Sequence, residues 1–137
     1  MADVELIEAA LAAVGRAYAP YSRFRVGAAV RASSGKVYTG ANVENASYGA
    51  TACAERNAIF AAVSAGERRL SAVAVAGGAE GVVTGYCAPC GICRQVMREF
   101  ADPAELTVYV AKSAADYRAY TLDRLLPDAF GPADLPA

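Results

Sequence analysis

Hydrophobic and polar positions in the first half of the chain follow helical spacing and then strand spacing. Apolar residues recur every three or four positions over residues 3–17, which predicts an amphipathic helix. Residues 26–32 and 37–42 are short, mostly apolar runs separated by a Ser-Ser-Gly-Lys turn, so they predict a β-hairpin. The segment from residue 42 to residue 51 is polar and irregular, which is typical of a loop.

The second half of the chain alternates helical and strand patterns. The Ala-rich residues 52–65 predict a buried helix, and residues 70–76 predict a strand that stops at the glycine pair that follows. A helix is predicted over residues 90–100, after a loop over residues 79–89. Residues 106–111 predict another strand.

The end of the chain carries weaker patterns. Residues 116–126 predict a mixture of turn and helix, and a tail rich in Pro and Gly follows from Pro127. The order helix, hairpin, helix, strand, helix, strand predicts an α/β fold with a mixed sheet and helices on both faces. Only the first strand pair must be antiparallel, because so short a turn cannot join parallel strands.

Composition narrows the possible classes of protein. A length of 137 residues suits one domain, residues 1–137, and a hydrophobic fraction of 55% excludes disorder. The net charge of −1 argues against a basic nucleic-acid surface. The acidic start and the lack of a long apolar run argue against a signal peptide and a membrane span, so we expect a cytoplasmic protein. The sequence has no histidine, which excludes every mechanism that needs an imidazole.

The candidate chemistry lies in the cysteines. Cys90 and Cys93 are three residues apart, which places both sulfurs on one side of a first helical turn, and Cys53 begins the other predicted helix. Helix N-termini favour thiolates, and clustered thiols in a reducing compartment are typical of metal or redox sites. Three ligands to a tetrahedral Zn²⁺ leave one position open, as in catalytic zinc sites.

Two neighbours of Cys53 have candidate roles. Glu55 can project toward a metal-bound water and shuttle protons, and burial beside an anionic centre should raise its pKa. Three thiolates give the zinc centre a net charge of −1, which the helix dipoles and Arg56 would offset. The plain alternatives are that Glu55 only complements the helix dipole and that Arg56 is an exposed helix arginine.

The cysteines leave two other arrangements open, one of which includes Cys87. A structural zinc site could use all four cysteines, although Ala88-Pro89 keeps Cys87 out of the helical turn of Cys90. Cys87 is otherwise expected to be a small buried apolar residue. The Cys90-x-x-Cys93 pair could also act as a redox dithiol.

Several blocks in order resemble the small, homotetrameric cytidine deaminases, and the resemblance covers nearly the whole chain. Cys53-Ala-Glu55 followed by Pro89-Cys90-Gly-Ile-Cys93 matches the three-cysteine form of the zinc deaminase signature. The other matching blocks are Tyr21-Ser-Arg-Phe24-Arg-Val-Gly-Ala-Ala, Gly40-Ala-Asn42-Val-Glu44-Asn45-Ala-Ser-Tyr48 and Leu125-Leu126-Pro127 with Phe130-Gly-Pro. The resemblance implies a three-layer α/β/α fold around a mixed sheet of about five strands.

The resemblance also implies substrate contacts. Phe24 would pack against the pyrimidine, Asn42 and Glu44 would hold sugar hydroxyls, and the Ala54 N–H would contact the base carbonyl. Three residues would reach into the pocket of an adjacent subunit in a tetramer: Ala46, Tyr48 and Phe130. Without the resemblance, Phe24 would be interpreted as a core residue, Asn42 as a turn residue and Phe130 as folding back on its own core.

The activity implied is hydrolytic deamination of cytidine and deoxycytidine to uridine and deoxyuridine, with release of ammonia, in pyrimidine salvage. One Zn²⁺ per chain would be bound by Cys53, Cys90 and Cys93, with Glu55 as proton shuttle and Arg56 beside the ligands. The alternatives are a deaminase of aminonucleoside antibiotics of the blasticidin type and a non-catalytic zinc module.

Overall fold

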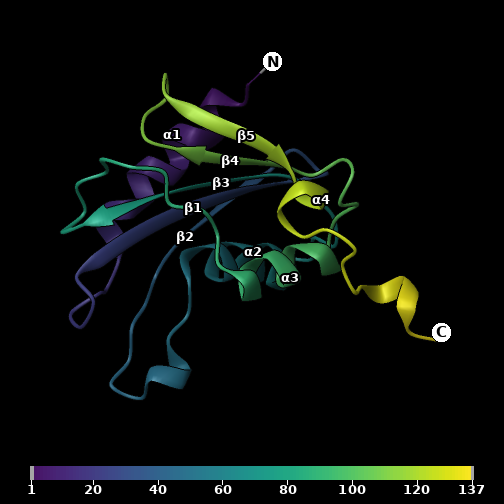
Figure 1. Ribbon diagram of the computed structural model, residues 1–137, viewed down its shortest axis with the longest axis horizontal. Coiled ribbons are helices and arrows are strands. Elements are labelled where there is room, and N and C mark those ends of the chain that lie inside the picture. The colour runs from purple at the N-terminus through teal and green to yellow at the C-terminus, as the bar shows by residue number, and fades with distance from the viewer. Residues whose placement is uncertain (1, 137) are drawn as a thin grey trace.

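The computed structural model describes residues 2–136 and has three layers, with one central sheet between helices (Figure 1). The five strands lie in the order β2-β1-β3-β4-β5. Helix α1 covers one face of the sheet, and α2 and α3 lie side by side against the other, which confirms the predicted α/β/α fold (Figure 1). The element bounds are α1 Val4–Ala13, β1 Phe24–Ala32, β2 Val37–Ala41, α2 Ala54–Ser64, β3 Leu70–Ala79, α3 Gly91–Glu99, β4 Thr107–Ala111, β5 Tyr117–Thr121 and α4 Leu122–Leu125.

The sheet is mixed, with a single parallel pair. The predicted hairpin is present, because β1 and β2 pair in antiparallel register with Ala28 opposite Gly40. β1 also pairs antiparallel with β3, and β4 pairs antiparallel with β5. Only β3 and β4 run parallel, and α3 makes the crossover that a parallel connection requires.

Alternating side chains of the sheet supply two hydrophobic cores. Ala28 and Val30 of β1 face α2 and α3, whereas Ala29 between them faces α1, as expected for the two-residue period of a strand. Ile59 and Met97 are fully buried on the α2 and α3 side. This larger core anchors the two helices whose N-termini carry the candidate ligands.

The predicted start of β1 and the predicted end of β3 are wrong. β3 does not stop at Gly77 and Gly78 but continues to Ala79, because β1 begins earlier than predicted and pairs with both glycines. A Cβ on Gly78 would lie 1.9 Å from the Val82 carbonyl oxygen, so Gly78 permits close packing of the next loop, and the glycine pair does not end the strand.

The segment 116–126 was predicted as turn and helix, but its first part forms the edge strand β5. Tyr117 to Thr121 pair with β4, and the short helix α4 follows directly. The pattern is weak because β5 lies at an edge and is only partly buried. Pairing with β4, which depends on tertiary structure, decides its conformation.

Two segments project from the three layers (Figure 1). The predicted loop between β2 and α2 extends away from the sheet and contains a short 3₁₀ turn at Tyr48–Ala50. The C-terminal segment after α4 leaves on another side. Within residues 2–136, no helix combines the length and apolar character that crossing a bilayer demands.

Candidate metal centre and active site

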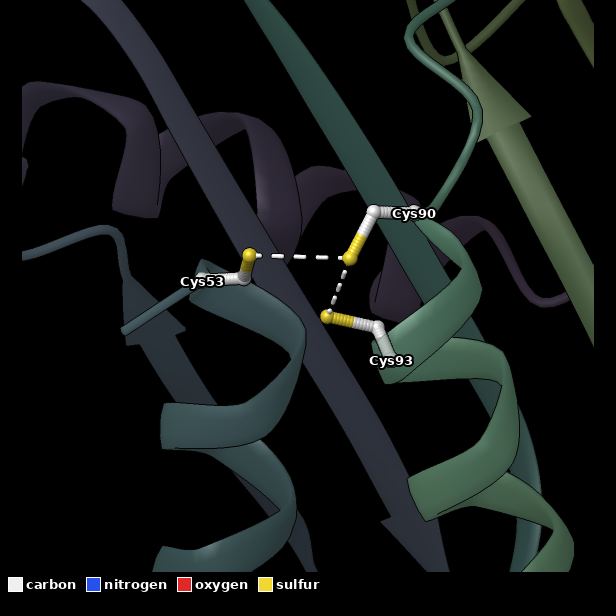
Figure 2. Close-up of side chains that lie close together, drawn as sticks. All are labelled: Cys53, Cys90 and Cys93. Atoms are coloured by element: carbon white, nitrogen blue, oxygen red, sulfur yellow. Dashed lines mark hydrogen bonds between the residues drawn. The ribbon is translucent and has the colours of Figure 1, made fainter. Parts of the chain in front are cut away.

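Three cysteines from two helix starts meet at one point (Figure 2). Cys53 is the N-cap of α2, Cys90 is the N-cap of α3, and Cys93 lies in the first turn of α3. The Sγ atom of Cys90 lies 3.8 Å from that of Cys53 and 3.4 Å from that of Cys93. Among the described residues, these three cysteines lie close enough together for their sulfur atoms to share one metal ion.

The donor set fits a zinc ion. Bonds of about 2.3 Å in tetrahedral geometry place two sulfur ligands about 3.8 Å apart, close to the observed sulfur separations. All four cysteines of the chain are free thiols, with no disulfide to compete for these sulfurs. The three sulfurs can therefore hold zinc with little rearrangement of the two helix starts.

The electrostatics of the centre favour negative charge on Cys53. Hydrogen bonds from Cys93 and from the Arg56 guanidinium hold the pKa of the Cys53 thiol well below its usual range. Nη2 of Arg56 lies 3.3 Å from Cys53 Sγ. Its Nε is buried without a hydrogen-bond partner, so a second donor of Arg56 remains available beside the sulfurs. Arg56 is therefore a half-buried partner of the thiol cluster and not an exposed helix arginine.

Glu55 is a buried carboxyl group in the first turn of α2. Only 4% of its surface is exposed. Burial, together with the negative charge of Cys53, raises the pKa of Glu55 to about 7. A group with such a pKa can both accept and donate a proton near neutral pH.

A cleft of about 280 Å³ opens beside the cysteine cluster and contains most of the predicted site residues. Cys53, Cys90 and Glu55 line it together with residues of β1, of the segments before β1 and after β2, and of the loop before α3. The residues that line it are Ser22, Phe24, Val26, Asn42, Glu44, Thr51, Ala52, Cys53, Ala54, Glu55, Cys87, Ala88 and Cys90. The predicted base-contacting and sugar-contacting residues thus share one cavity with the metal cluster.

Phe24 and Asn42 are fixed at the wall of this cleft by β1. Phe24 is 40% exposed and lines the cleft, so it is not a core residue. Oδ1 of Asn42 accepts the Val26 N–H at 2.9 Å, and its Nδ2 donates to the Phe24 carbonyl at 2.8 Å. Because an amide has two donors and two acceptor sites, Asn42 keeps one of each for a ligand.

Three predicted substrate-binding residues lie outside the cleft, on the projecting segments. Ala46 and Tyr48 are exposed in the loop after β2, and Tyr48 borders an adjoining hollow of about 380 Å³ that it shares with Glu44. Phe130 is 57% exposed, and Gln95 of α3 donates a hydrogen bond of 2.8 Å to its carbonyl. The Phe130 side chain is therefore not buried in the core of its own chain.

Cys87 lines the cleft but is not part of the sulfur cluster. Burial raises the pKa of its thiol to about 11, so it stays protonated. The arrangement supports three ligands with one open position and not a closed four-cysteine site.

Sequence reasoning missed the role of Ser22. It appears in the sequence only as part of a matching block with no role of its own, yet it lines both the cleft and the adjoining hollow and donates a hydrogen bond to Glu44. A serine two residues before an aromatic strand start carries no recognisable signal, because its partner lies 22 positions away in sequence.

A metal-binding cluster with an open position beside a buried carboxylate is typical of a metal-dependent hydrolase. Comparison with known proteins gives the same class. The family model for the cytidine and deoxycytidylate deaminase zinc-binding region matches residues 1–110. The cytidine deaminase of Halalkalibacterium halodurans is 48% identical over 130 residues, which is 95% of each chain.

Solved structures show the same likeness. The cytidine deaminase of Burkholderia pseudomallei is 51% identical, with a TM-score of 0.84 over 95% of this chain and 100% of that chain. The cytidine deaminase of Mycobacterium tuberculosis is 45% identical, with a TM-score of 0.80 over 96% of this chain and 99% of that chain. The chain therefore belongs to the cytidine deaminase family.

Proposed function

We propose that this protein is a zinc-dependent enzyme that hydrolyses cytidine and deoxycytidine to uridine and deoxyuridine with release of ammonia. The observation that carries the proposal is the buried carboxyl group of Glu55 beside three clustered sulfurs in one cleft. The zinc-binding family model and the identity of up to 48% to curated cytidine deaminases support the same activity.

Cys53, Cys90 and Cys93 are the proposed ligands of one zinc ion per chain. Zinc bound there supplies Lewis acidity that activates water for hydrolysis. Three thiolates would leave the centre with a net negative charge, which weakens this effect. The Arg56 guanidinium, 3.3 Å from Cys53 Sγ, offsets that charge together with the N-termini of α2 and α3.

Glu55 is the proposed proton shuttle. It takes a proton from the attacking water and delivers it to N3 of the cytosine ring while the water oxygen bonds to C4. It then takes the proton of the new C4 hydroxyl group and passes it to the amino group. The C4–N bond breaks, ammonia leaves, and the C4 carbonyl of the product forms. The Glu55 pKa of about 7 suits both steps, because the same group must act as base and then as acid.

Four residues of the cleft are the proposed substrate contacts. Phe24 packs against the pyrimidine ring, and the Ala54 N–H, which has no intrahelical partner at the start of α2, donates to the base carbonyl. Asn42 and Glu44 bind sugar hydroxyls through the donor and acceptor sites that their internal hydrogen bonds leave open.

We further propose a homotetramer with shared active sites. Ala46, Tyr48 and Phe130 would complete the pocket of a neighbouring chain. The exposure of Tyr48 at 74% and of Phe130 at 57% supports this, because large aromatic side chains on projecting segments gain stability when a partner covers them.

The chain is proposed to act as a single domain, residues 1–137, in pyrimidine salvage in the cytoplasm. A reducing compartment suits it, because three thiols within 4.8 Å of one another must stay reduced to bind metal. The substrate is a free nucleoside, so no nucleic-acid or membrane partner is proposed.

The test is a comparison of ammonia release from cytidine, deoxycytidine and an antibiotic of the blasticidin type, with zinc measured on the same sample. We expect turnover of the two nucleosides with about one zinc per chain. Turnover of the antibiotic alone would favour the aminonucleoside deaminase. Zinc without any ammonia release would favour a non-catalytic module, and thiols that react equally with and without chelator would favour a redox protein.

A further inference from the structure

The carboxylate of Glu44 is held on three sides by the loop that precedes β1. The backbone N–H groups of Tyr21 and Ser22 both donate to Oε1 at 3.0 Å, and the Ser22 hydroxyl donates to Oε2 at 2.5 Å. An ionised carboxylate has about four acceptor sites, so these three donors leave one site for a ligand. The direction from which Glu44 can accept a ligand hydroxyl is thereby set by the loop.

The orientation of the Ser22 hydroxyl is itself determined by Phe24. The Phe24 N–H donates to Ser22 Oγ at 3.0 Å, and an N–H group can only donate. The hydroxyl proton must therefore point toward Glu44. The result is a directed chain from Phe24 N–H through Ser22 Oγ–H to Glu44 Oε2, in which each hydrogen bond strengthens the next.

The loop stays in place through contacts that do not involve the Ser22 side chain. Arg23 has a φ of 59°, which turns the backbone so that Ser22 Oγ reaches back to Phe24. The Arg23 N–H donates to the Ala19 carbonyl at 3.0 Å, and the Glu80 N–H donates to the Arg23 carbonyl at 2.7 Å. Removing the hydroxyl alone should leave this backbone path intact.

We propose that Ser22 is a positioning residue that orients Glu44 toward a sugar hydroxyl and so sets the preference for nucleosides that carry one. This inference rests on the proposed function. It assigns Ser22 an effect on the sugar end of the ligand only, because its hydroxyl contacts Glu44 and the backbone of Phe24 but not the cysteine cluster.

The test compares cytidine with 2′,3′-dideoxycytidine, which lacks both ring hydroxyls of the sugar. The variants are Ser22→Ala, Ser22→Thr, Glu44→Gln and the double variant Ser22→Ala with Glu44→Gln. For Ser22→Ala, we expect kcat/KM for cytidine to fall about tenfold, mainly through KM, as for loss of one hydrogen bond to a charged group. For dideoxycytidine, kcat/KM should change less than about twofold, and Ser22→Thr should restore most of the loss.

The double variant separates positioning from a general structural role. If Ser22 acts through Glu44, adding Ser22→Ala to Glu44→Gln should cause little further loss with cytidine. An equal loss with both nucleosides, or fully additive losses in the double variant, would overturn the inference. If the wild-type protein deaminates neither nucleoside, the proposed function itself fails and the inference fails with it. Thermal unfolding of each variant verifies that it is folded.

Discussion

Substitution of Gly40 by Ala tests how closely α2 must approach the sheet to place its N-terminus. Gly40 lies in β2 beneath α2, where a Cβ atom would stand 2.5 Å from Ala58 N, 2.7 Å from Ala54 O and 2.9 Å from Asn57 C. All three are backbone atoms, so no side-chain rotation relieves the contact. The Ala58 contact alone is about 0.9 Å shorter than an ordinary van der Waals contact of 3.4 Å.

The helix must therefore move as a body, which has two consequences. Overpacking of this kind costs about 1–3 kcal/mol, and backbone contacts belong at the upper end, so we expect a loss of about 3 kcal/mol in unfolding free energy. The start of α2 carries Cys53 and Glu55, and displacing catalytic groups by about 1 Å lowers rates by up to roughly 100-fold. We expect Gly40→Ala to weaken zinc retention and to lower kcat/KM at least tenfold.

The assay is urea unfolding at fixed protein and zinc concentrations, combined with ammonia release from cytidine. Gly15→Ala is the matched control, because a Cβ there meets nothing within 4 Å and the residue is exposed and does not line the cleft. If Gly40→Ala were as stable and as active as Gly15→Ala, the close approach of α2 to β2 would not position the site.

Other predictions concern the N-terminal ion pair, the ligand set and the assembly. Arg31 lowers the pKa of Asp3, so Asp3→Asn, which keeps an N-cap, should cost about 1 kcal/mol of unfolding free energy at pH 7. By urea unfolding, the difference should begin to shrink as the pH falls below about 4, where the unfolded carboxyl group is protonated, and should vanish once the pH is below the lowered pKa of the folded state. A deficit that persists in acid would contradict this. Cys87→Ser should retain zinc, whereas Cys90→Ser should lose it; metal analysis giving the reverse would exclude the proposed ligands. Light scattering should give about four chains per particle, and an active monomer would refute shared sites.

The layers of the fold could be predicted from sequence because hydrophobic periodicity reports burial against a sheet. The helix around Ile59 and the strand around Val73 have patterns strong enough to be identified. β5 could not be identified, since an exposed edge strand has no such pattern and depends on pairing with β4. The end of β3 was predicted wrongly because a glycine pair predicts a turn, whereas here Gly78 gives room to Val82 and Gly77 gives room to β1.

The candidate site could be predicted in part. The pairing of Cys90 and Cys93 follows from spacing, because residues at a helix start and one turn later bring their sulfurs together, whereas Cys53 is added to them through the resemblance to the zinc deaminase signature. The hydrogen bonds of Asn42 to β1 and the contact of Ser22 with Glu44 could not be predicted. Both depend on how distant segments meet in the fold, which local spacing does not encode.

The central claim is that one carboxylate moves the protons of a zinc-dependent hydrolysis. The most direct measurement is the rate of ammonia release from cytidine by Glu55→Gln, with zinc content determined on the same sample. Removal of a general acid and base costs about 10²–10⁴ in rate. The account predicts that about one zinc per chain remains while turnover falls by at least about 100-fold. Turnover close to the wild-type rate at full zinc occupancy would contradict it.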